Sequence, residues 1–314
     1  MRPRPFLALV GPTASGKTEA SIGVAASLGA EILCIDSMLV YRGMDIGTAK
    51  PTSAQRDAVP HHLLDLVEPS EPFSVARFQA AAARSLADIE GRGQAALLVT
   101  GSALYLRAVV DGFEIPETEP ATRGLLEAEV RVLGPQALYR RLASFDPAAA
   151  ARIEPANGRR VVRALEVAAI TGRPFSSGAD AWASYPEGAL AAAGVDLPRD
   201  VLHRRIEERT VHMMPGLLAE TRALLDGGSE RFLTSRQAIG YAEAVACLRG
   251  RMSEEEAAAA IIRRTKALAR RQMAWFRRDP RIRWFPAPAE GAAGIQEALT
   301  GFFRGALDAV EVER

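Results

Sequence analysis

The sequence contains only two cysteines, Cys34 and Cys247, among 314 residues. Two thiols cannot build a disulfide framework or a cysteine-rich zinc site, so structural thiols in a reducing compartment are predicted. Any long apolar segment is also missing, which argues against a membrane span, and we expect no signal peptide. These absences predict a cytoplasmic protein without membrane association.

An excess of charge of one sign is missing as well. The net charge is +1 and the hydrophobic fraction is 48%, which excludes both a disordered chain and a globally basic nucleic-acid-binding protein. Any nucleic-acid surface must therefore be local. No internal repeat is present, and the length predicts either two domains or one large domain with an insertion.

A glycine-rich loop directly follows the apolar run from Phe6 to Val10 and fits the pattern G-x-x-x-x-G-K-[ST]. In such a loop, backbone N–H groups turn onto phosphate oxygens, the lysine adds positive charge, and the last hydroxyl can ligate Mg²⁺. An ordinary strand-to-helix turn is the alternative, but strand, spacing, lysine and hydroxyl all favour a diphosphate or triphosphate site. The predicted phosphate-binding residues are Gly11, Pro12, Thr13, Ala14, Ser15, Gly16, Lys17 and Thr18, with Thr18 as the candidate metal ligand.

Apolar runs that lead into a loop and a helix recur along the chain. The runs at 6–10, 31–35 and 95–99 show this pattern, and a further run lies at 191–195. The repetition predicts an α/β fold, a P-loop NTPase-like parallel sheet flanked by helices. Ligands of such sheets bind beyond the carboxyl ends of the strands. The phosphate loop, Asp36 and Ser102 are therefore expected to converge on one crevice.

Strand patterns disappear between residues 121 and 171, where Ala, Leu and Arg recur at helical spacing between proline-containing boundaries. We interpret this stretch as a helical insertion domain. The predicted division is a first part of the α/β core at 1–115, a helical insertion at 116–188, and a second part of the core with basic C-terminal helices at 189–314.

A helix in the last third begins with the capping-box pair Ser253 and Glu256. A basic strip beside its apolar stripe is interrupted by a single acid, Asp279. The strip is either a solvated face or a surface for a polyanion, and the interleaved tryptophans favour the polyanion. The predicted stripe comprises Ile261, Thr265, Leu268, Gln272 and Trp275. The basic strip comprises Arg263, Arg264, Lys266, Arg270, Arg271, Arg277, Arg278, Arg281 and Arg283.

Three further features leave alternatives open. Asp36 ends an apolar run, where a carboxylate serves as a magnesium ligand, a general base or a helix N-cap. The glycine-punctuated loop from Gly43 to Lys50 either covers a ligand or is a simple surface loop. His61 and His62 are adjacent in an extended pattern, so packing and hydrogen bonding are favoured over a shared metal.

The combined motifs resemble the tRNA dimethylallyltransferases of bacterial type, also called tRNA isopentenyltransferases. The resemblance rests on the phosphate loop, on the stretch from Asp36 to Pro51 and on the string from His61 to Asp65. It continues through 101–106, 160–167, 238–241 and 265–277 and covers about residues 6 to 284. It implies transfer of a dimethylallyl group from dimethylallyl diphosphate to the exocyclic amine of the adenosine 3′-adjacent to the anticodon, in tRNAs that read codons beginning with U.

The resemblance also implies roles for individual residues. Asp36 would be the catalytic base, and Lys17, with Mg²⁺ on Thr18, would stabilise charge on the departing diphosphate. Ser102 keeps the hydroxyl expected at a third catalytic position. Contacts with the flipped-out adenosine and the tRNA are implied for Asp36, Ser37, Met38, Leu39, Ser102, Arg123, Arg159, Arg160, Val161, Val162 and Arg163, and the basic strip adds Arg270 and Arg277.

Several positions depart from the family pattern. Leu39 replaces the usual glutamine and cannot form a hydrogen bond, which leaves an amide contact to the substrate base in doubt. Thr100 stands at a usual glycine, Ala242 replaces a basic residue, and the stretch from Arg209 to Leu217 is one residue short and lacks an aspartate. None of these changes removes the phosphate loop or the base.

Three other functions share part of this pattern. A small-molecule kinase would need the phosphate loop but not the basic strip. A transferase that acts on free adenine nucleotides would share the catalytic residues but would not need positive charge at Arg270 and Arg277. A non-enzymatic nucleic-acid binder would not need Lys17. For the favoured function, the expected partners are tRNA and dimethylallyl diphosphate, the expected cofactor is Mg²⁺, and the expected state is a monomer.

Overall fold

A computed structural model describes residues 5–113, 115–178, 182, 184–188, 190–227, 235, 238–289 and 291–312. The chain divides into two compact units. The first, which we call the α/β unit, comprises residues 1–112 and 186–314, and the second, the helical unit, comprises residues 113–185.

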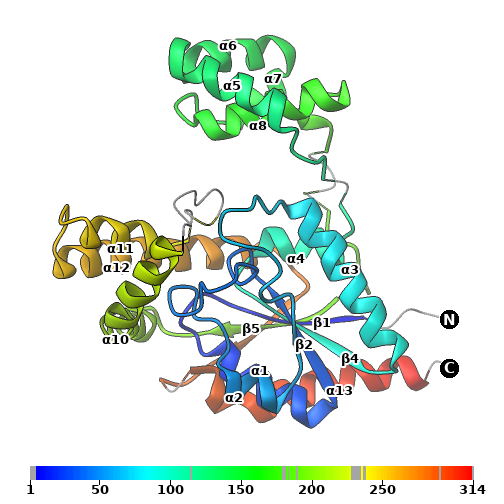
Figure 1. The fold of residues 1–314 in the computed structure, drawn as a ribbon. Coiled ribbons are helices and arrows are strands. Elements are labelled where there is room, and N and C mark those ends of the chain that lie inside the picture. The colour runs from blue at the N-terminus through cyan, green and yellow to red at the C-terminus, as the bar shows by residue number, and fades with distance from the viewer. Residues whose placement is uncertain are drawn as a thin grey trace. The chain divides into compact units, whose positions relative to one another are not determined.

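The α/β unit contains a six-stranded sheet whose strands are all parallel, which confirms the predicted α/β fold (Figure 1). The strand order is β3-β2-β4-β1-β5-β6, so the first strand of the chain lies in the middle of the sheet. The two outermost strands were not predicted from the sequence. The strands are β1 (Phe6–Val10), β2 (Ala30–Ile35), β3 (His61–His62), β4 (Ala95–Thr100), β5 (Leu190–Asp196) and β6 (Ile282–Pro286).

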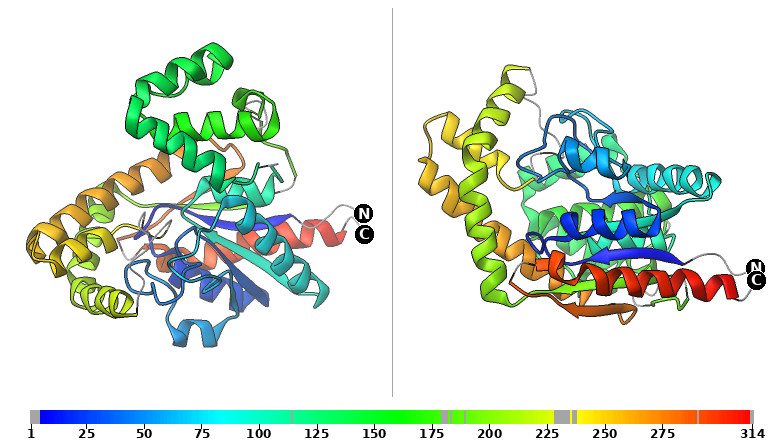
Figure 2. Two further views of the ribbon diagram at one scale, coloured as in Figure 1. Left: turned by 45° about the horizontal axis from the view of Figure 1, so that its top comes forward. Right: turned by 90° about the horizontal axis from the view of Figure 1, so that it is seen from below.

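Helices cover both faces of this sheet. Figure 1 shows α1 and α13 below the sheet and α3 and α4 above it, and the right panel of Figure 2 shows α13 in red running alongside α1 in blue. No helix among the described residues is both long and apolar enough to cross a bilayer. The helices are α1 (Lys17–Leu28), α2 (Ser53–Ala58), α3 (Val75–Gly91), α4 (Ala103–Val110), α10 (Arg199–Asp226), α11 (Tyr241–Leu248), α12 (Glu254–Phe276) and α13 (Gln296–Val312), with the short 3₁₀ helix η3 (Gly291–Ile295) before α13.

The two faces of the sheet follow from the alternation of side chains along each strand. Leu7 and Leu9 of β1 pack in one hydrophobic cluster with α1, α10 and α13. Ala8 and Val10 pack in the other, with α3, α4 and α12. Since β1 is covered on both sides, its run is continuously apolar, as buried parallel strands require.

Helix α12 begins as the sequence predicted, because Ser253 accepts a hydrogen bond from the backbone N–H of Glu256 and completes a capping box. The predicted stripe is wrong at its end. Trp275 is 45% exposed, whereas the following residue, Phe276, is buried. The physical reason is that the buried face advances by four residues as far as Ala269 and then by seven to Phe276, which turns Trp275 outward. The members of this face are Ala257, Ile261, Thr265, Ala269 and Phe276.

The helical unit has a hydrophobic core of its own, to which Leu126, Leu142 and Val161 contribute. Proline stands at the first helical position of three of its helices, where its fixed backbone angle favours a helix start. The helices are α5 (Pro120–Leu133), α6 (Pro135–Phe145), α7 (Pro147–Ala150) and α8 (Gly158–Thr171), followed by the 3₁₀ helix η1 (Phe175–Gly178).

Candidate active site

The predicted phosphate loop lies between the carboxyl end of β1 and the start of α1. Its lysine folds back into the loop, since Lys17 Nζ donates hydrogen bonds to the carbonyl oxygen of Pro12 at 2.6 Å and to Ser15 Oγ at 3.5 Å. Gly16 precedes the helix at φ 85°, a left-handed conformation, and a Cβ at this position would lie 3.1 Å from the backbone nitrogen of Ala292. The loop is thus wrapped around an ammonium group.

Groups from the later part of the chain, after residue 200, hold this loop in place. The backbone N–H of Thr13 donates to Gln272 Oε1 of α12 at 2.9 Å. From α10, Arg205 Nε donates to the carbonyl oxygen of Ala14 at 3.0 Å. From η3, the backbone N–H of Ala292 donates to the carbonyl oxygen of Ser15 at 3.0 Å. The sequence analysis placed Gln272 on the packing stripe and gave Arg205 no role.

A cavity of about 580 Å³ opens beside the loop within the α/β unit. Asp36 lines it from the end of β2, Gly101 from the end of β4, and Thr48 and Ala49 from the loop after β2. The phosphate loop, including Lys17, lines it as well, together with side chains of α10 and with Gln272 of α12. The carboxyl ends of neighbouring parallel strands therefore bring the phosphate loop and Asp36 to one cavity, as the topology requires.

Asp36 is held by the turn that follows β2. Its Oδ1 accepts a hydrogen bond from the backbone N–H of Met38 at 2.8 Å. No helix begins between Asp36 and α2, which starts at Ser53, so the carboxylate is not a helix N-cap. Burial raises the pKa of Asp36, while the Met38 N–H and the charge of Lys17 oppose that rise.

Thr100 ties the ends of two strands together. Its hydroxyl donates to the carbonyl oxygen of Ile35 at 2.7 Å and accepts from the backbone N–H of Ser102 at 2.8 Å. Ser102 stands at the N-cap position of α4, directly after Gly101 of the cavity wall. The threonine thereby links Ile35, which immediately precedes Asp36, to the backbone of Ser102.

Arg209 of α10 faces the same cavity and was given no role in the sequence analysis. Its Nη2 donates to Thr13 Oγ1 at 2.9 Å, and its buried Nε has no hydrogen-bond acceptor among the described residues. Burial, and then the positive charge of Arg209, lower the pKa of Lys17 to about 7, although Asp36 acts in the opposite direction. Two cations share a low-dielectric site, an arrangement that a bound anion stabilises.

The basic strip of the C-terminal third is less uniform than its sequence indicates. Arg277 Nη2 donates to Asp196 of β5 at 2.6 Å, and its guanidinium lies 4.1 Å from the ring centre of Trp284. Arg264 forms an ion pair with Glu243 of α11. The prediction of a nearly single-signed strip is wrong, because strands and helices distant in sequence supply the acids. Arg270 remains exposed on α12.

In the helical unit, Glu166 of α8 gathers two of the predicted arginines. Its side chain is fully buried, and its Oε2 accepts from Arg163 Nη1 at 2.8 Å and lies 3.5 Å from Arg123 Nη1. Arg163 Nη2 also donates to the carbonyl oxygen of Pro116 at 2.6 Å. The backbone N–H of Glu119 completes the set by donating to Glu166 Oε1 at 3.2 Å. The sequence analysis did not single out Glu166.

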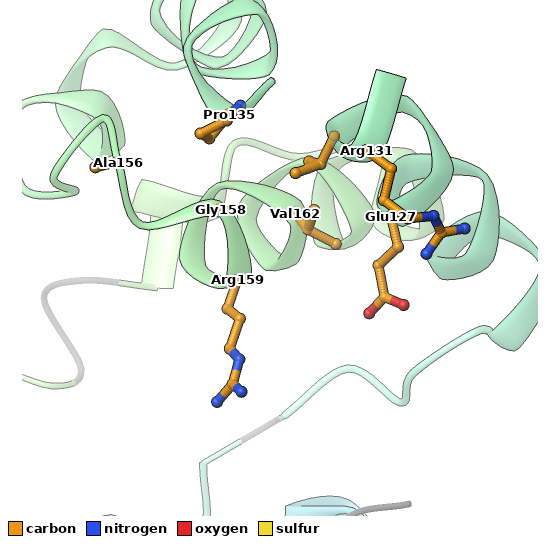
Figure 3. A pocket seen from close by; sticks show the side chains of 8 residues that line it. Glu127, Arg131, Pro135, Ala156, Gly158, Arg159 and Val162 are labelled. Atoms are coloured by element: carbon orange, nitrogen blue, oxygen red, sulfur yellow. The ribbon is translucent and has the colours of Figure 1, made fainter. Parts of the chain in front are cut away.

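The other predicted residues of α8 divide into exposed and buried positions. Arg159 and Arg160 are exposed, and Figure 3 shows Arg159 extending away from the start of α8 beside a hollow of about 430 Å³ between α5 and α8. Val161 and Val162 are 0% and 2% exposed and belong to the core of the unit. Side-chain contact with tRNA at these two valines is therefore excluded by packing, because the helix turns them inward.

The paired histidines form hydrogen bonds. His62 Nε2 lies 2.6 Å from Glu31 Oε2, and His61 Nδ1 lies 2.7 Å from the carbonyl oxygen of Val59. Among the described residues, no group of three or more His, Cys, Asp or Glu side chains is arranged to hold a metal ion.

Comparison with known proteins identifies the family. A family model described as IPP transferase matches residues 39–279, and one described as isopentenyl transferase matches residues 5–65. The tRNA dimethylallyltransferase of Kineococcus radiotolerans is 47% identical over 295 residues, which cover 90% of this chain and 91% of that protein. The chain belongs to the tRNA dimethylallyltransferase family.

Other members of the tRNA dimethylallyltransferase family match nearly the whole chain. The tRNA dimethylallyltransferase of Roseiflexus sp. is 44% identical over 97% of this chain and 99% of its own length. The crystal structure of the full-length tRNA isopentenylpyrophosphate transferase from Bacillus halodurans matches with a TM-score of 0.71 at 40% identity and covers 99% of both chains. The resemblance predicted from the sequence is confirmed.

Two departures from the pattern expected of tRNA dimethylallyltransferases have structural counterparts. Leu39 lines the cavity, where it offers only apolar contact. The stretch from Arg209 to Leu217 lies within the continuous helix α10. Its unusual spacing does not interrupt the helix that carries Arg209 to the cavity.

Proposed function

We propose that this chain, as a tRNA dimethylallyltransferase, transfers a dimethylallyl group from dimethylallyl diphosphate to the exocyclic amine of the adenosine 3′-adjacent to the anticodon, in tRNAs that read codons beginning with U. The observation that carries the proposal is the cavity in which Lys17, Arg209 and Asp36 meet. It combines cations for a diphosphate with a carboxylate for an amine proton. In this proposal the enzyme acts as a cytoplasmic monomer.

The phosphate loop forms the diphosphate end of the proposed site. The partly buried Lys17 and the buried Nε of Arg209 are cationic donors beside the loop, and the Nε has no acceptor among the described residues. Negative charge accumulates on the diphosphate as the allylic C–O bond breaks, so these donors bind the transition state more strongly than the ground state. They thereby accelerate departure of the diphosphate.

Asp36 is the proposed general base. An adenine amine is a weak nucleophile because its lone pair is delocalised into the ring, and it must lose a proton as the new C–N bond forms. Burial raises the pKa of Asp36, which makes it a better proton acceptor, and the Met38 N–H fixes the position of Oδ1. Ser102 is proposed to contact the reacting groups through its hydroxyl.

The residues of the cavity fit Mg²⁺. Thr18 offers a hydroxyl on the cavity wall. Mg²⁺ in proteins is usually held by one or two protein groups together with water and substrate phosphate oxygens, so a carboxylate cluster is not needed. When bound, the ion would neutralise charge on the diphosphate.

The exposed arginines are proposed to contact tRNA. Arg159 and Arg160 of α8 and Arg270 of α12 are exposed and would contact phosphates. Arg123 and Arg163 are proposed to contact the tRNA from fixed positions, because Glu166 restrains both guanidinium groups. Arg277 is restrained in the same way by Asp196. The segment Ser37 to Leu39 is proposed to contact the flipped-out adenosine.

The test is transfer of label from radiolabelled dimethylallyl diphosphate into unmodified tRNA that reads codons beginning with U, in Mg²⁺ buffer with AMP as a competing acceptor. We expect label in tRNA, and we expect Asp36→Asn to reduce turnover by about 10² to 10⁴ while tRNA affinity is preserved. Asp57→Asn, an exposed carboxylate on α2, is the matched control and should retain full activity.

The other outcomes each point to a different function. Label in AMP alone would assign the chain to the transferases that act on free nucleotides. Absence of label from both acceptors would contradict prenyl transfer and favour a phosphotransferase, which ATP turnover would then reveal.

A further inference from the structure

The loop from Met44 to Lys50, which carries Thr48 and Ala49 of the cavity wall, is fastened to α10 by one carboxylate. Glu220 Oε2 accepts hydrogen bonds from the backbone N–H groups of Asp45 and Ile46, each at 2.8 Å. We call the segment Met44 to Lys50 the wall loop.

The other oxygen of this carboxylate is also bonded to donors. Glu220 Oε1 accepts from the hydroxyl of Tyr241 at 2.5 Å and lies 3.4 Å from the backbone nitrogen of Gly47. Four donors thus converge on the two oxygens. An ionised carboxylate accepts from all four, whereas an amide would turn its NH₂ group against some of them.

Side-chain packing also holds the wall loop against α10 and α11. A Cβ at Gly47 would lie 2.5 Å from Cε2 of Tyr241 and 2.9 Å from Cδ1 of Leu217, so only glycine allows the loop to approach α10 and α11 this closely. Burial and the neighbouring carboxylate of Glu220 raise the pKa of Tyr241, which keeps its hydroxyl a donor.

The far end of the wall loop is held independently of α10. Lys50 Nζ, on a side chain with no exposed surface, bonds to the carbonyl oxygen of Tyr41 at 2.8 Å, to Asp45 Oδ1 at 2.5 Å and to Asp65 Oδ1 at 2.7 Å. Loss of Glu220 should therefore loosen the wall loop without releasing it from the fold.

Helix α10 also bonds to the phosphate loop, which lines the same cavity. Arg205 and Arg209 bind the phosphate loop through the carbonyl oxygen of Ala14 and the hydroxyl of Thr13. Glu220 lies about three helical turns further along the same helix. One helix thus bonds to both parts of the wall, and its segment from Arg209 to Glu220, which contains Pro215, spans the distance between them.

We propose that Glu220 is a positioning residue that sets the width of the cavity between the wall loop and the phosphate loop, and thereby selects the length of the prenyl chain on the diphosphate donor. The inference rests on the proposed function. Glu220 touches no reacting atom in this proposal. It acts through Thr48 and Ala49, whose distance from the phosphate loop depends on its hydrogen bonds.

The experiment compares Glu220→Gln and Tyr241→Phe with the wild type. Tyr241→Phe removes one donor but keeps the ring that packs on Gly47. Asp226→Asn is the control, because it removes an exposed carboxylate from the same helix. Hydrogen exchange is measured at the amides of Asp45, Ile46 and Gly47. Steady-state transfer to tRNA is measured with dimethylallyl diphosphate and with the longer geranyl diphosphate.

In Glu220→Gln we expect faster exchange at the three amides and a KM for dimethylallyl diphosphate raised about tenfold, with the KM for tRNA within about twofold of wild type. The ratio of kcat/KM for dimethylallyl over geranyl diphosphate should fall. Tyr241→Phe should change the same quantities in the same direction but by less, and the control should match the wild type.

Two results would contradict the inference for different reasons, and they can be told apart. Faster exchange with unchanged donor KM and unchanged preference for the shorter chain would overturn the positioning role and leave Glu220 as a structural residue. Absence of transfer by the wild-type protein would instead overturn the proposed function on which the inference rests.

Discussion

The cations beside the phosphate loop in the α/β unit and the two arginines at Glu166 in the helical unit are held in opposite ways. In the cavity of the α/β unit, Lys17 and Arg209 donate hydrogen bonds to uncharged oxygens, namely the carbonyl of Pro12 and the hydroxyls of Ser15 and Thr13. In the helical unit, the guanidinium groups of two arginines meet the carboxylate of a buried glutamate.

This difference indicates which kind of anionic ligand each group of cations can bind. Buried positive charge without a paired carboxylate is unstable by itself, so it is expected where a small anion completes the site. Arg123 and Arg163 are already compensated by Glu166 and remain partly exposed, so they are suited to the edge of a large polyanion, where geometry matters more than net charge.

The largest expected effect comes from removing an uncompensated cation. Arg209→Ala should reduce kcat/KM for dimethylallyl diphosphate by about 10² to 10³, because a preorganised donor to the developing negative charge is lost. Steady-state kinetics with saturating tRNA measure this. Arg204→Ala, which removes an exposed arginine from the same helix, is the control. Equal losses in both variants would show that the buried position of Arg209 has no special role.

The second prediction concerns the ion pairs that Glu166 forms with Arg123 and Arg163. Glu166→Gln removes the counter-charge of Arg163 and one of the two carboxylates paired with Arg123, the other being Glu127, and should lower the free energy of unfolding by about 1 to 3 kcal/mol. Urea denaturation followed by circular dichroism measures it. The affinity for tRNA should fall, while the KM for dimethylallyl diphosphate stays unchanged. Glu129→Gln, an exposed partner of Arg141, should alter stability by no more than about 0.5 kcal/mol.

Reversing an exposed charge should produce a smaller, salt-dependent effect. Arg160→Glu or Arg270→Glu should weaken tRNA binding and reduce the slope of log K against log salt by about 1 to 2, since each variant loses a phosphate contact and adds a repulsive charge. Titrations of fluorescent tRNA at several salt concentrations measure the slope. A comparable loss of dimethylallyl diphosphate binding would place these arginines at the cavity instead of on a tRNA surface.

The smallest expected effect concerns protons. The pKa of Lys17 is about 7 in the free protein, so above pH 7 this amine is mostly neutral, and a bound diphosphate must raise its pKa. Binding should therefore take up a proton, up to about one at pH 8, and affinity should decline as pH rises above 7. Calorimetry at pH 8 in two buffers with different ionisation enthalpies measures the uptake.

Lys17→Arg is the variant that isolates this effect, because a guanidinium stays protonated. The dependence of the binding heat on the buffer should disappear in it. The same buffer dependence in wild type and Lys17→Arg would assign the proton to another group.

The predictable parts of the molecule are those whose determinants are contiguous in sequence. The phosphate loop, the four interior strands, the capping box at Ser253 and the run of helices between residues 121 and 171 are local patterns. Strand β3 has only two residues, and β6 was hidden within a basic segment because its arginine and tryptophan were interpreted as a polyanion surface. Edge strands show only a weak alternation of apolar and polar residues, so whether they form depends on pairing with the neighbouring strand in the folded protein.

Within the site, the sequence predicted Lys17 and Asp36 through motifs but assigned no role to Arg209, Glu166 or Glu220. Each of these three residues contacts groups that lie far from it in the sequence, and no motif in the residues around it indicates that contact. The i, i+4 spacing of Arg205 and Arg209 does indicate that the two cations share one face of a helix. The sequence does not indicate that this face points toward the phosphate loop.

The dependence of the phosphate loop on Arg205, Gln272 and Ala292 has a consequence for synthesis on the ribosome. The loop is translated well before its supports, and β1 acquires its neighbour β5 only once residues 190–196 have been made. Helices of the insertion pack on residues close in sequence and can fold during translation. The substrate pocket, in contrast, is completed only after Ala292 has been translated, so a product terminated before that residue lacks a complete site.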